Sequence, residues 1–448
     1  MEVSHASIAH KPHSTKLEQL PVELLCEILS VIDNLTSLSS ATLASRTLYN
    51  AFINARCSIL SKVLVNQVGV DMIPHALAAV ESIPTTHEDW GAFLAEPARV
   101  PDLLTADQVY LIVRLSAVVN KLSTLFVQSA VGIQPQIQSW SPIPSKSELA
   151  RIERTLYRFE TLRNYFGALS GDLPAFGKNI DAFFATLAPW EVEQLGSIHD
   201  FLFHQIQPAC DDIASHDVVW GSIEVEPALN YASPEVQAIM SSGLASVYRI
   251  ATAKTYAERH KLLYQRNGPD RSDKFLYRAL KRYSEVNMRR GSSRALFTAG
   301  QDRDGGPQDA WEWAHTNCAP RVQAYRLDRT GLRRWGYVFW DRARLEEISL
   351  FKEPFRPPRY VSEEHEVDDD FEASWRARKR VARAGGTGYW SATDQSQIVF
   401  AKRRQPVYHR RGQPRVGPPF ANAKREFAAA SARIDIAMKR RKGKTDQI

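Results

Sequence analysis

Apolar residues recur at helical spacing over most of the chain. Between residues 17 and 350 they repeat mainly every three or four positions, and alternating runs of β-branched residues are few. No fixed-period repeat is present. The clearest stripe falls near one face of a helix and comprises Leu149, Ile152, Leu156, Phe159 and Phe166. The pattern predicts an all-α body.

Local signals predict where several of these helices begin and end. Pro234 suits the first position of a helix, and Asp341 is expected to cap a helix that contains Leu345 and Ile348. Capping-box pairs, which satisfy two free amides at a helix start, are Thr105 with Gln108 and Ser145 with Glu148. A further helix is predicted to stop at Pro208 and carries Leu195, Ile198, Leu202 and Ile206.

The composition changes after residue 351. Prolines come first, then an acidic block at 363–370, then a basic segment. Residues 371–448 hold 19 of the 57 lysines and arginines and 5 of the 50 acids, which gives this segment a net charge of +14. The net charge of the whole chain is +7, so residues 1–370 have a net charge of −7. Because few apolar residues could offset the entropy of ordering this chain, 352–448 is predicted to be mostly disordered. The acidic block and the basic segment could pair with each other or recruit different partners.

Residues 17–60, which follow a leader at 1–16 predicted to be disordered, are rich in apolar positions. A helix is expected to start at Pro21, and Asp33-Asn34 should separate it from a second helix that begins near Thr36. The main stripe of the first helix is Leu25, Ile28, Leu29 and Ile32. A segment this short cannot enclose all of its apolar surface. Part of that surface is therefore expected to meet the rest of the chain or another protein.

This segment resembles the F-box motif in the form common in fungal proteins. Tyr49 stands where many F-boxes have Trp, and Ala44-Ser45 replaces a frequent Val-Cys pair. The matching positions are Leu20-Pro21, Glu23, Leu24-Leu25, Ile28-Leu29, Leu35, Ser37-Leu38, Leu43 and Ser45-Arg46. More loosely, residues 197–202, 216–221 and 332–341 resemble segments of uncharacterised fungal F-box-like families.

The resemblance implies a non-enzymatic, substrate-recognition adaptor of an SCF-type (Skp–cullin–F-box) ubiquitin ligase that needs no cofactor. A three-helix F-box at 17–60 would bind the Skp adaptor, and a helical domain at 61–351 would hold a target protein. Much of the adaptor-facing surface would come from Leu20, Pro21, Leu24, Ile28 and Leu29. The second helix would be shaped by Leu38, Leu43 and Arg46. The alternative interpretation is a helical hairpin buried against its own body.

Motifs for catalysis or metal binding are missing from the sequence. No HExxH, Walker A or GxSxG pattern occurs, so an enzyme would need a site assembled from distant residues. The four cysteines lie far apart without a CxxC pair, which indicates a reducing compartment and no zinc module. Four tryptophans could line a groove for a target or act as packing anchors, namely Trp311, Trp313, Trp335 and Trp340.

The sequence favours a soluble protein of the nucleus or cytoplasm. No signal peptide precedes residue 17. The apolar run from Val109 to Val127 contains Arg114 and Lys121, which favours a buried helix over a membrane span. Lys439-Arg440-Arg441-Lys442 resembles a nuclear-import signal. The alternative function is a nuclear nucleic-acid-associated or scaffold protein that acts through its basic tail, where aromatic residues are interleaved with cations.

Overall fold

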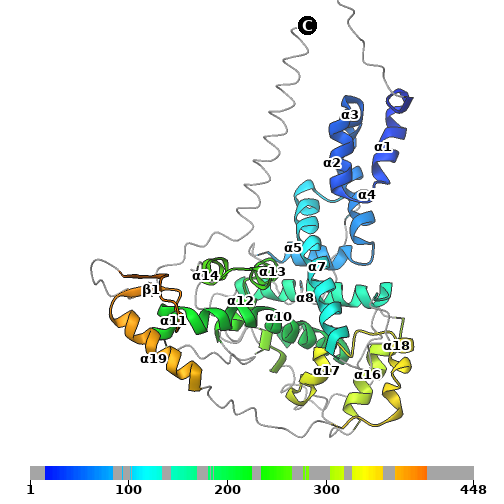
Figure 1. The fold of residues 1–448 in the computed structure, drawn as a ribbon. Helices are drawn as coiled ribbons and strands as arrows, with labels where there is room; N and C mark the ends of the chain where they lie inside the picture. Colours follow the sequence, from blue (N-terminus) through cyan, green and yellow to red (C-terminus); the bar gives the residue numbers. More distant parts are fainter. Residues whose placement is uncertain are drawn as a thin grey trace, which may run out of the picture. The chain divides into compact units, whose positions relative to one another are not determined.

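The computed structural model is mostly helical, as the periodicity predicts (Figure 1). Apart from a few isolated positions, the structure describes residues 16–83, 103–133, 143–168, 186–223, 234–264, 303–316, 325–356 and 369–400. The chain divides into two compact units, which we call the amino-terminal unit and the body. The amino-terminal unit comprises Met1–Glu81 and Glu96–Ala117, and the body comprises Ser82–Ala95 and Val118–Ile448. The amino-terminal unit thus extends well beyond residue 60.

Short helices joined by tight breaks build the amino-terminal unit. They are η1 (Lys16–Gln19), α1 (Val22–Ser30), α2 (Leu35–Ala44), α3 (Arg46–Asn54), α4 (Arg56–Val68), α5 (Ile73–Glu81) and the start of α7 (Ala106–Ile133). Asn34 caps α2 by accepting a 2.8 Å hydrogen bond from the amide of Ser37. Ser45 ends α2 and caps α3 through the amide of Thr47. The break predicted at Asp33-Asn34 is confirmed.

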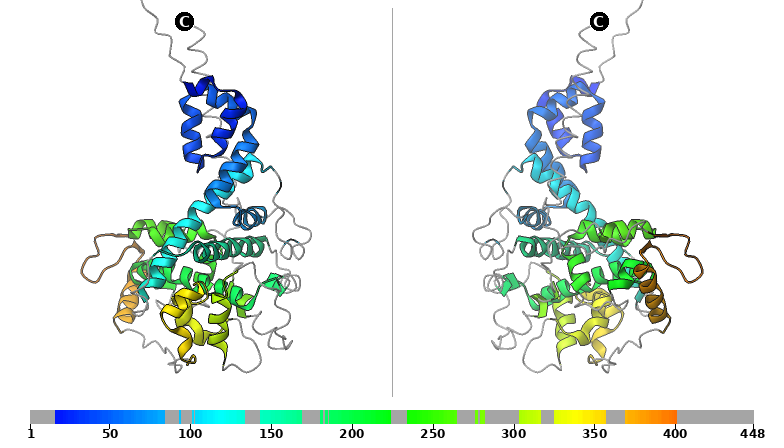
Figure 2. Two further views of the ribbon diagram at one scale, coloured as in Figure 1. Left: turned by 90° about the vertical axis from the view of Figure 1, so that its right-hand side faces the viewer. Right: turned by 90° about the vertical axis from the view of Figure 1, so that its left-hand side faces the viewer.

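The core of this unit lies between helices that run side by side (Figure 2). Both α1 and α2 pack on α3 and α4. The side chains buried between these helices include Leu25, Leu29, Leu38, Leu48, Ala51, Ile59, Val63 and Leu64. Burying a side chain of this size stabilises the fold by about 1.5–3 kcal/mol, so these contacts account for most of what holds the four helices together.

One long helix, α10 (Pro189–His216), runs through the middle of the body (Figure 1). It contacts most of the other body helices, and almost every residue from Val192 to Phe203 is buried. The other body elements before residue 357 are the remainder of α7, α8 (Lys146–Ala168), α11 (Val218–Ile223), α12 (Pro234–Met240), α13 (Leu244–Thr252), α14 (Tyr256–Tyr264), α16 (Gly306–His315), η4 (Leu327–Arg329), α17 (Thr330–Arg334), α18 (Arg342–Glu347) and η5 (Leu350–Lys352).

The two predicted capping boxes are confirmed. The Gln108 side chain accepts from the amide of Thr105, whose hydroxyl accepts from the amide of Gln108. Ser145 and Glu148 exchange the same pair of hydrogen bonds at the start of α8. Helix α12 begins at Pro234, as expected.

The prediction that a helix stops at Pro208 is wrong. Helix α10 continues through this residue to His216. A proline inside a helix removes one backbone hydrogen bond and costs about 3 kcal/mol or more. Here Ile206, Cys210 and Ile213 are fully buried on both sides of it, and their burial offsets that cost.

The expected disorder of 352–448 is also wrong for residues 369–400. Helix α19 (Asp369–Arg383) packs along α11 and is followed by an antiparallel pair of short strands, β1 (Gly386–Gly388) and β2 (Ile398–Phe400) (Figure 1). The pairing joins Gly386 to Phe400. Where the structure describes the body, it is therefore helical with one small hairpin, and residues 401–448 lie outside the described part of the chain.

Helix α7 is, by length and composition alone, able to cross a membrane. Helices α4 and α5 meet the same criteria only as one span bent by 112°. In the body, α7 buries Val119, Leu122 and Phe126, and the Phe126 ring meets those of Phe201 and Phe339 edge to face. This burial is what a core helix of a soluble protein also shows.

Candidate protein-binding surface

Helix α1 presents an apolar face that its own unit does not cover. Leu24, Ile28 and Val31 are spaced i, i+4, i+7, so they lie on one side of the helix. Their exposed fractions are 50%, 38% and 70%. We call these three residues the α1 apolar face. Large side chains gathered in this way on a surface are typical of a protein-binding site.

The opposite side of α1 is fixed by packing and by polar contacts. Leu25 and Leu29 are each 1% exposed. At the carboxyl end of the helix, the Asn66 side chain donates to the carbonyls of Ser30 and Ile32, at 3.0 and 3.1 Å. These contacts from α4 satisfy carbonyl groups that a helix end leaves free. They also hold the α1 apolar face in one orientation.

The structure divides the eight predicted adaptor-binding residues between surface and core. Leu29 and Leu38 are buried, so they belong to the core and not to an adaptor-facing surface. This corrects the sequence-based expectation for Leu29. The other six are at least partly exposed: Leu20 just before α1, Pro21 at its N-cap, Leu24 and Ile28 on the α1 apolar face, Leu43 near the end of α2 and Arg46 at the start of α3.

The sequence places Val31 with Leu24 on an apolar face that adjoins the main stripe, but Val31 was not among the predicted adaptor-binding residues. Val31 directly follows α1 and is its most exposed apolar side chain. Leu17 in η1, at 40% exposure, stands seven residues before Leu24. Along α1 and its C-cap, Leu24 and Val31 lie on a side that adjoins the predicted main stripe and is continuous with Ile28. Only the positions of α3 and α4 decide which stripe faces inward.

A buried polar network occupies the centre of the body. The Arg333 guanidinium donates to Asp200 at 2.6 Å and to Glu193 at 3.3 Å. Asp200 also accepts from the hydroxyl of Tyr325 at 3.0 Å and lies 2.9 Å from Nδ1 of His199. All four ionisable groups, Glu193, His199, Asp200 and Arg333, are fully buried.

Burial and charge pull the pKa values of this network apart. Burial alone would raise the pKa of Asp200, but Arg333 and His199 outweigh it and hold that pKa below its usual value. Burial raises the pKa of Glu193 to about 7, although Arg333 opposes the rise. The network thus has one firmly ionised carboxylate, and its side chains lie within packed protein. It stabilises the contact between α10 and α17.

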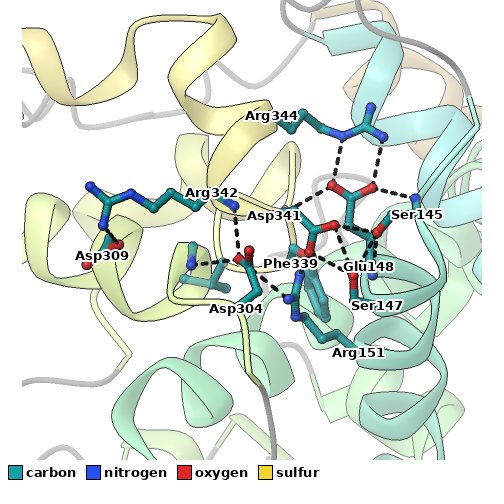
Figure 3. Close-up of polar contacts among 12 residues, drawn as sticks. Ser145, Ser147, Glu148, Arg151, Asp304, Asp309, Phe339, Asp341, Arg342 and Arg344 are labelled. Carbon is teal, nitrogen blue, oxygen red and sulfur yellow. Dashed lines mark hydrogen bonds and ion pairs between the residues drawn. The ribbon is translucent and has the colours of Figure 1, made fainter.

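A second cluster joins the start of α8 to α18 and α16 (Figure 3). The buried Glu148 carboxylate accepts from the Ser145 amide, the Asp341 amide and the Arg344 side chain, at 2.8–2.9 Å. Arg151, which is also buried, donates to Asp341 at 2.7 Å.

The Asp341 side chain serves this cluster and not the helix that follows it. It accepts from the Ser145 and Ser147 hydroxyls at 2.5 and 2.9 Å and makes no cap of its own. Asp304 accepts instead from the amides of Gly306 and Arg342, which open α16 and α18 (Figure 3). Asp341 is therefore at the N-cap position, as predicted, but Asp304 supplies the hydrogen bond.

Neither cluster has the composition of a metal site. Among the described residues, no group of three or more His, Cys, Asp and Glu side chains could hold a metal ion. The tryptophans considered for a target groove mostly pack inward, since Trp311, Trp335 and Trp340 are buried. Trp313 donates to the carbonyl of Glu353 at 2.7 Å. The nuclear-import candidate Lys439-Arg440-Arg441-Lys442 lies outside the described residues.

Comparisons of the chain with protein-family profiles, with curated proteins and with solved structures found no match. The resemblance to the F-box motif therefore rests on the residues of 17–60 themselves.

Proposed function

We propose that the chain is a substrate-recognition adaptor of an SCF-type ubiquitin ligase, and that it binds the Skp-type adaptor through the α1 apolar face. The observation that carries the proposal is the exposure of Leu24, Ile28 and Val31 on a helix whose other side is locked into its own unit. Two of these residues, Leu24 and Ile28, belong to the F-box resemblance.

The role assigned to the chain is to bring two proteins together. The α1 apolar face would bind the ligase, and the body would bind the target. A ubiquitin-loaded enzyme on the ligase would then lie near the target, which raises the effective concentration of the reacting groups. The chain itself would perform no bond chemistry. Its part in ubiquitin-dependent degradation, in the nucleus or the cytoplasm, would consist of binding alone.

The test is calorimetric titration of the full chain with a purified Skp-type adaptor. Ile28→Asp and Val31→Asp each place a charge on the α1 apolar face. Burying one such apolar side chain is worth about 1.5–3 kcal/mol, so each variant should lose tenfold or more in affinity. Val70→Asp is the matched control, because Val70 belongs to the same unit and is 67% exposed, close to the 70% of Val31.

The outcomes separate the proposal from its alternatives. Binding by the unaltered chain and by Val70→Asp, with loss in the two α1 variants, would support it. No binding by the unaltered chain, or equal affinity in all variants, would reject it. Circular dichroism of each variant shows whether the amino-terminal unit stays folded.

A further inference from the structure

Helix α19 separates its side chains into a buried face and a basic face. Phe371, Ser374, Arg378 and Val381 recur at heptad-like spacing on the first of these faces, where Arg378 is buried and the other three are partly buried. Arg376, Lys379, Arg380 and Arg383, spaced i, i+3, i+4, i+7, share another side. We call these four the α19 basic face. Arg376, Arg380 and Arg383 are exposed, and Lys379 is half-exposed above the Trp375 ring.

The buried face holds the helix firmly in place. Arg378 is fully buried and donates to the carbonyl of Asp217 at 3.1 Å. After the hairpin begins, the amide of Trp390 donates to the carbonyl of His216 at 2.7 Å, and the Tyr389 ring stacks on the His216 ring. The α19 basic face is thereby presented from a fixed helix, and binding to it would lose little conformational entropy.

The helix dipole and local ion pairs explain only part of this charge. Cations favour the last turn of a helix, and that effect fades within one turn. It applies to Arg380 and Arg383 but not to Arg376 and Lys379. Glu372 pairs with Arg376 at 2.5 Å, yet no acidic residue occurs between Glu372 and Asp394. Within the described residues, Arg380 and Arg383 have no acidic partner.

We propose that the α19 basic face binds the phosphate backbone of a nucleic acid strand. Three of its four cations are arginines, whose planar forks match phosphate oxygens in pairs. The row from Arg376 to Arg383 rises about 10 Å along the helix. A duplex presents about six phosphate charges over that length. A strand of RNA or DNA offers this dense, regular negative charge, and no base-reading group is needed.

Residues beyond the hairpin extend the same charge. Between Asp394 and Glu426 the sequence contains eight lysines and arginines and no acid. The proposal is independent of the ligase role, since it uses none of the residues of the amino-terminal unit.

The test compares two fourfold variants of the full chain. In the first, Arg376, Lys379, Arg380 and Arg383 become Gln. In the control, four exposed cations elsewhere become Gln, namely Arg56, Lys62, Arg114 and Lys121. The control matches the test in charge and environment, because Lys62 pairs with Glu27 and both Arg114 and Lys121 lie over tyrosine rings.

Fluorescence anisotropy with a labelled 30-nucleotide single strand and with a duplex of the same sequence, at 50–200 mM salt, measures affinity. Each phosphate contact contributes about 0.7 (single strand) or 0.9 (duplex) to the slope of log affinity against log salt. The α19 variant should lose at least tenfold in affinity, and its slope should fall by about 3. The control should keep both within twofold. The tighter of the two probes identifies the form of nucleic acid.

A loss of nucleic-acid affinity could also come from misfolding, so one further variant is chosen that should bind the probes more tightly. Glu372→Gln removes the acid that pairs with Arg376 and should raise affinity two- to fivefold, which a damaged protein would not do. The proposal is overturned if the unaltered chain does not bind either probe at 50 mM salt. Equal loss in both fourfold variants, or no loss in the α19 variant, also overturns it.

Discussion

Replacing Arg333 with Met should destabilise the body strongly, and more so at neutral than at acidic pH. Methionine keeps an unbranched apolar stem but lacks the guanidinium that pairs with Asp200 at 2.6 Å and Glu193 at 3.3 Å. Removing one partner of a buried ion pair typically costs about 3–5 kcal/mol, because the other charge stays buried without compensation. With its pKa already raised to about 7, Glu193 can take up a proton near neutral pH, so most of the cost falls on Asp200.

The pH dependence follows from the pKa of Asp200. In the unaltered protein this pKa lies below its usual value, so the ionised group stabilises the fold above about pH 4 and that contribution is lost as the pH falls further. Without Arg333, burial should raise the same pKa above its unfolded value. The variant then binds a proton on folding and regains stability as the pH is lowered. Its deficit should therefore shrink from pH 7 toward pH 4.

The assay is urea unfolding followed by tryptophan fluorescence. All ten tryptophans lie at residue 90 or beyond and outside the amino-terminal unit, so the signal reports the body alone. Arg334→Met is the matched control, because Arg334 is the next residue on α17 and is exposed. Surface substitutions of this kind usually change stability by less than about 0.5 kcal/mol. A deficit under 1 kcal/mol, or one that stays constant between pH 7 and pH 4, would refute the reasoning.

Three other substitutions test separate parts of the fold. A Cβ at Gly221 would lie 2.7 Å from Cβ of Arg378, so Gly221→Ala should release α19 and speed tryptic cleavage within this helix. Gly132→Ala is the control and should not change the cleavage rate, because a Cβ at Gly132 would have no atom within 4 Å. Leu29→Ala should cost the amino-terminal unit about 2–5 kcal/mol in hydrogen-exchange measurements; protection as in the unaltered chain would show that Leu29 is not a core residue. Because the folded pKa of Glu193 is about 7, its stabilising effect is present below about pH 4 and is lost as the pH rises through 7. Glu193→Gln should therefore flatten the fall in stability between pH 5 and pH 8, and an unchanged slope would contradict the raised pKa.

Sequence periodicity indicated helices within residues 17–60, but it showed neither the break at Ser45 between α2 and α3 nor which helix faces point inward. Residues 22–31 contain apolar positions on two adjoining stripes, and both score as amphipathic. Packing against α3 and α4 buries Leu25 and Leu29 and leaves Leu24 and Ile28 outside. That choice depends on tertiary contacts, which is why Leu29 was expected on the adaptor-facing surface.

The buried networks could not be read from spacing at all. Arg333 and Asp200 are 133 positions apart, and Arg151 and Asp341 are 190 apart. Nothing in the spacing of Asp200 and Arg333 indicates that they meet. In the structure they form a polar contact between α10 and α17.

The order of α19 follows from the same kind of long-range pairing. By composition, Arg378 is one more cation of a segment predicted to be disordered. In the structure, the groups that contact Arg378 come from residues far earlier in the chain. The Asp217 carboxylate accepts from the hydroxyls of Tyr256 and Tyr264 at 2.7 and 3.0 Å, and its backbone carbonyl accepts from Arg378. Gly221 lets α11 approach α19 closely at this point. The α11 segment thus binds the first helix of the basic segment through Arg378, while Arg380 and Arg383 on the α19 basic face stay exposed.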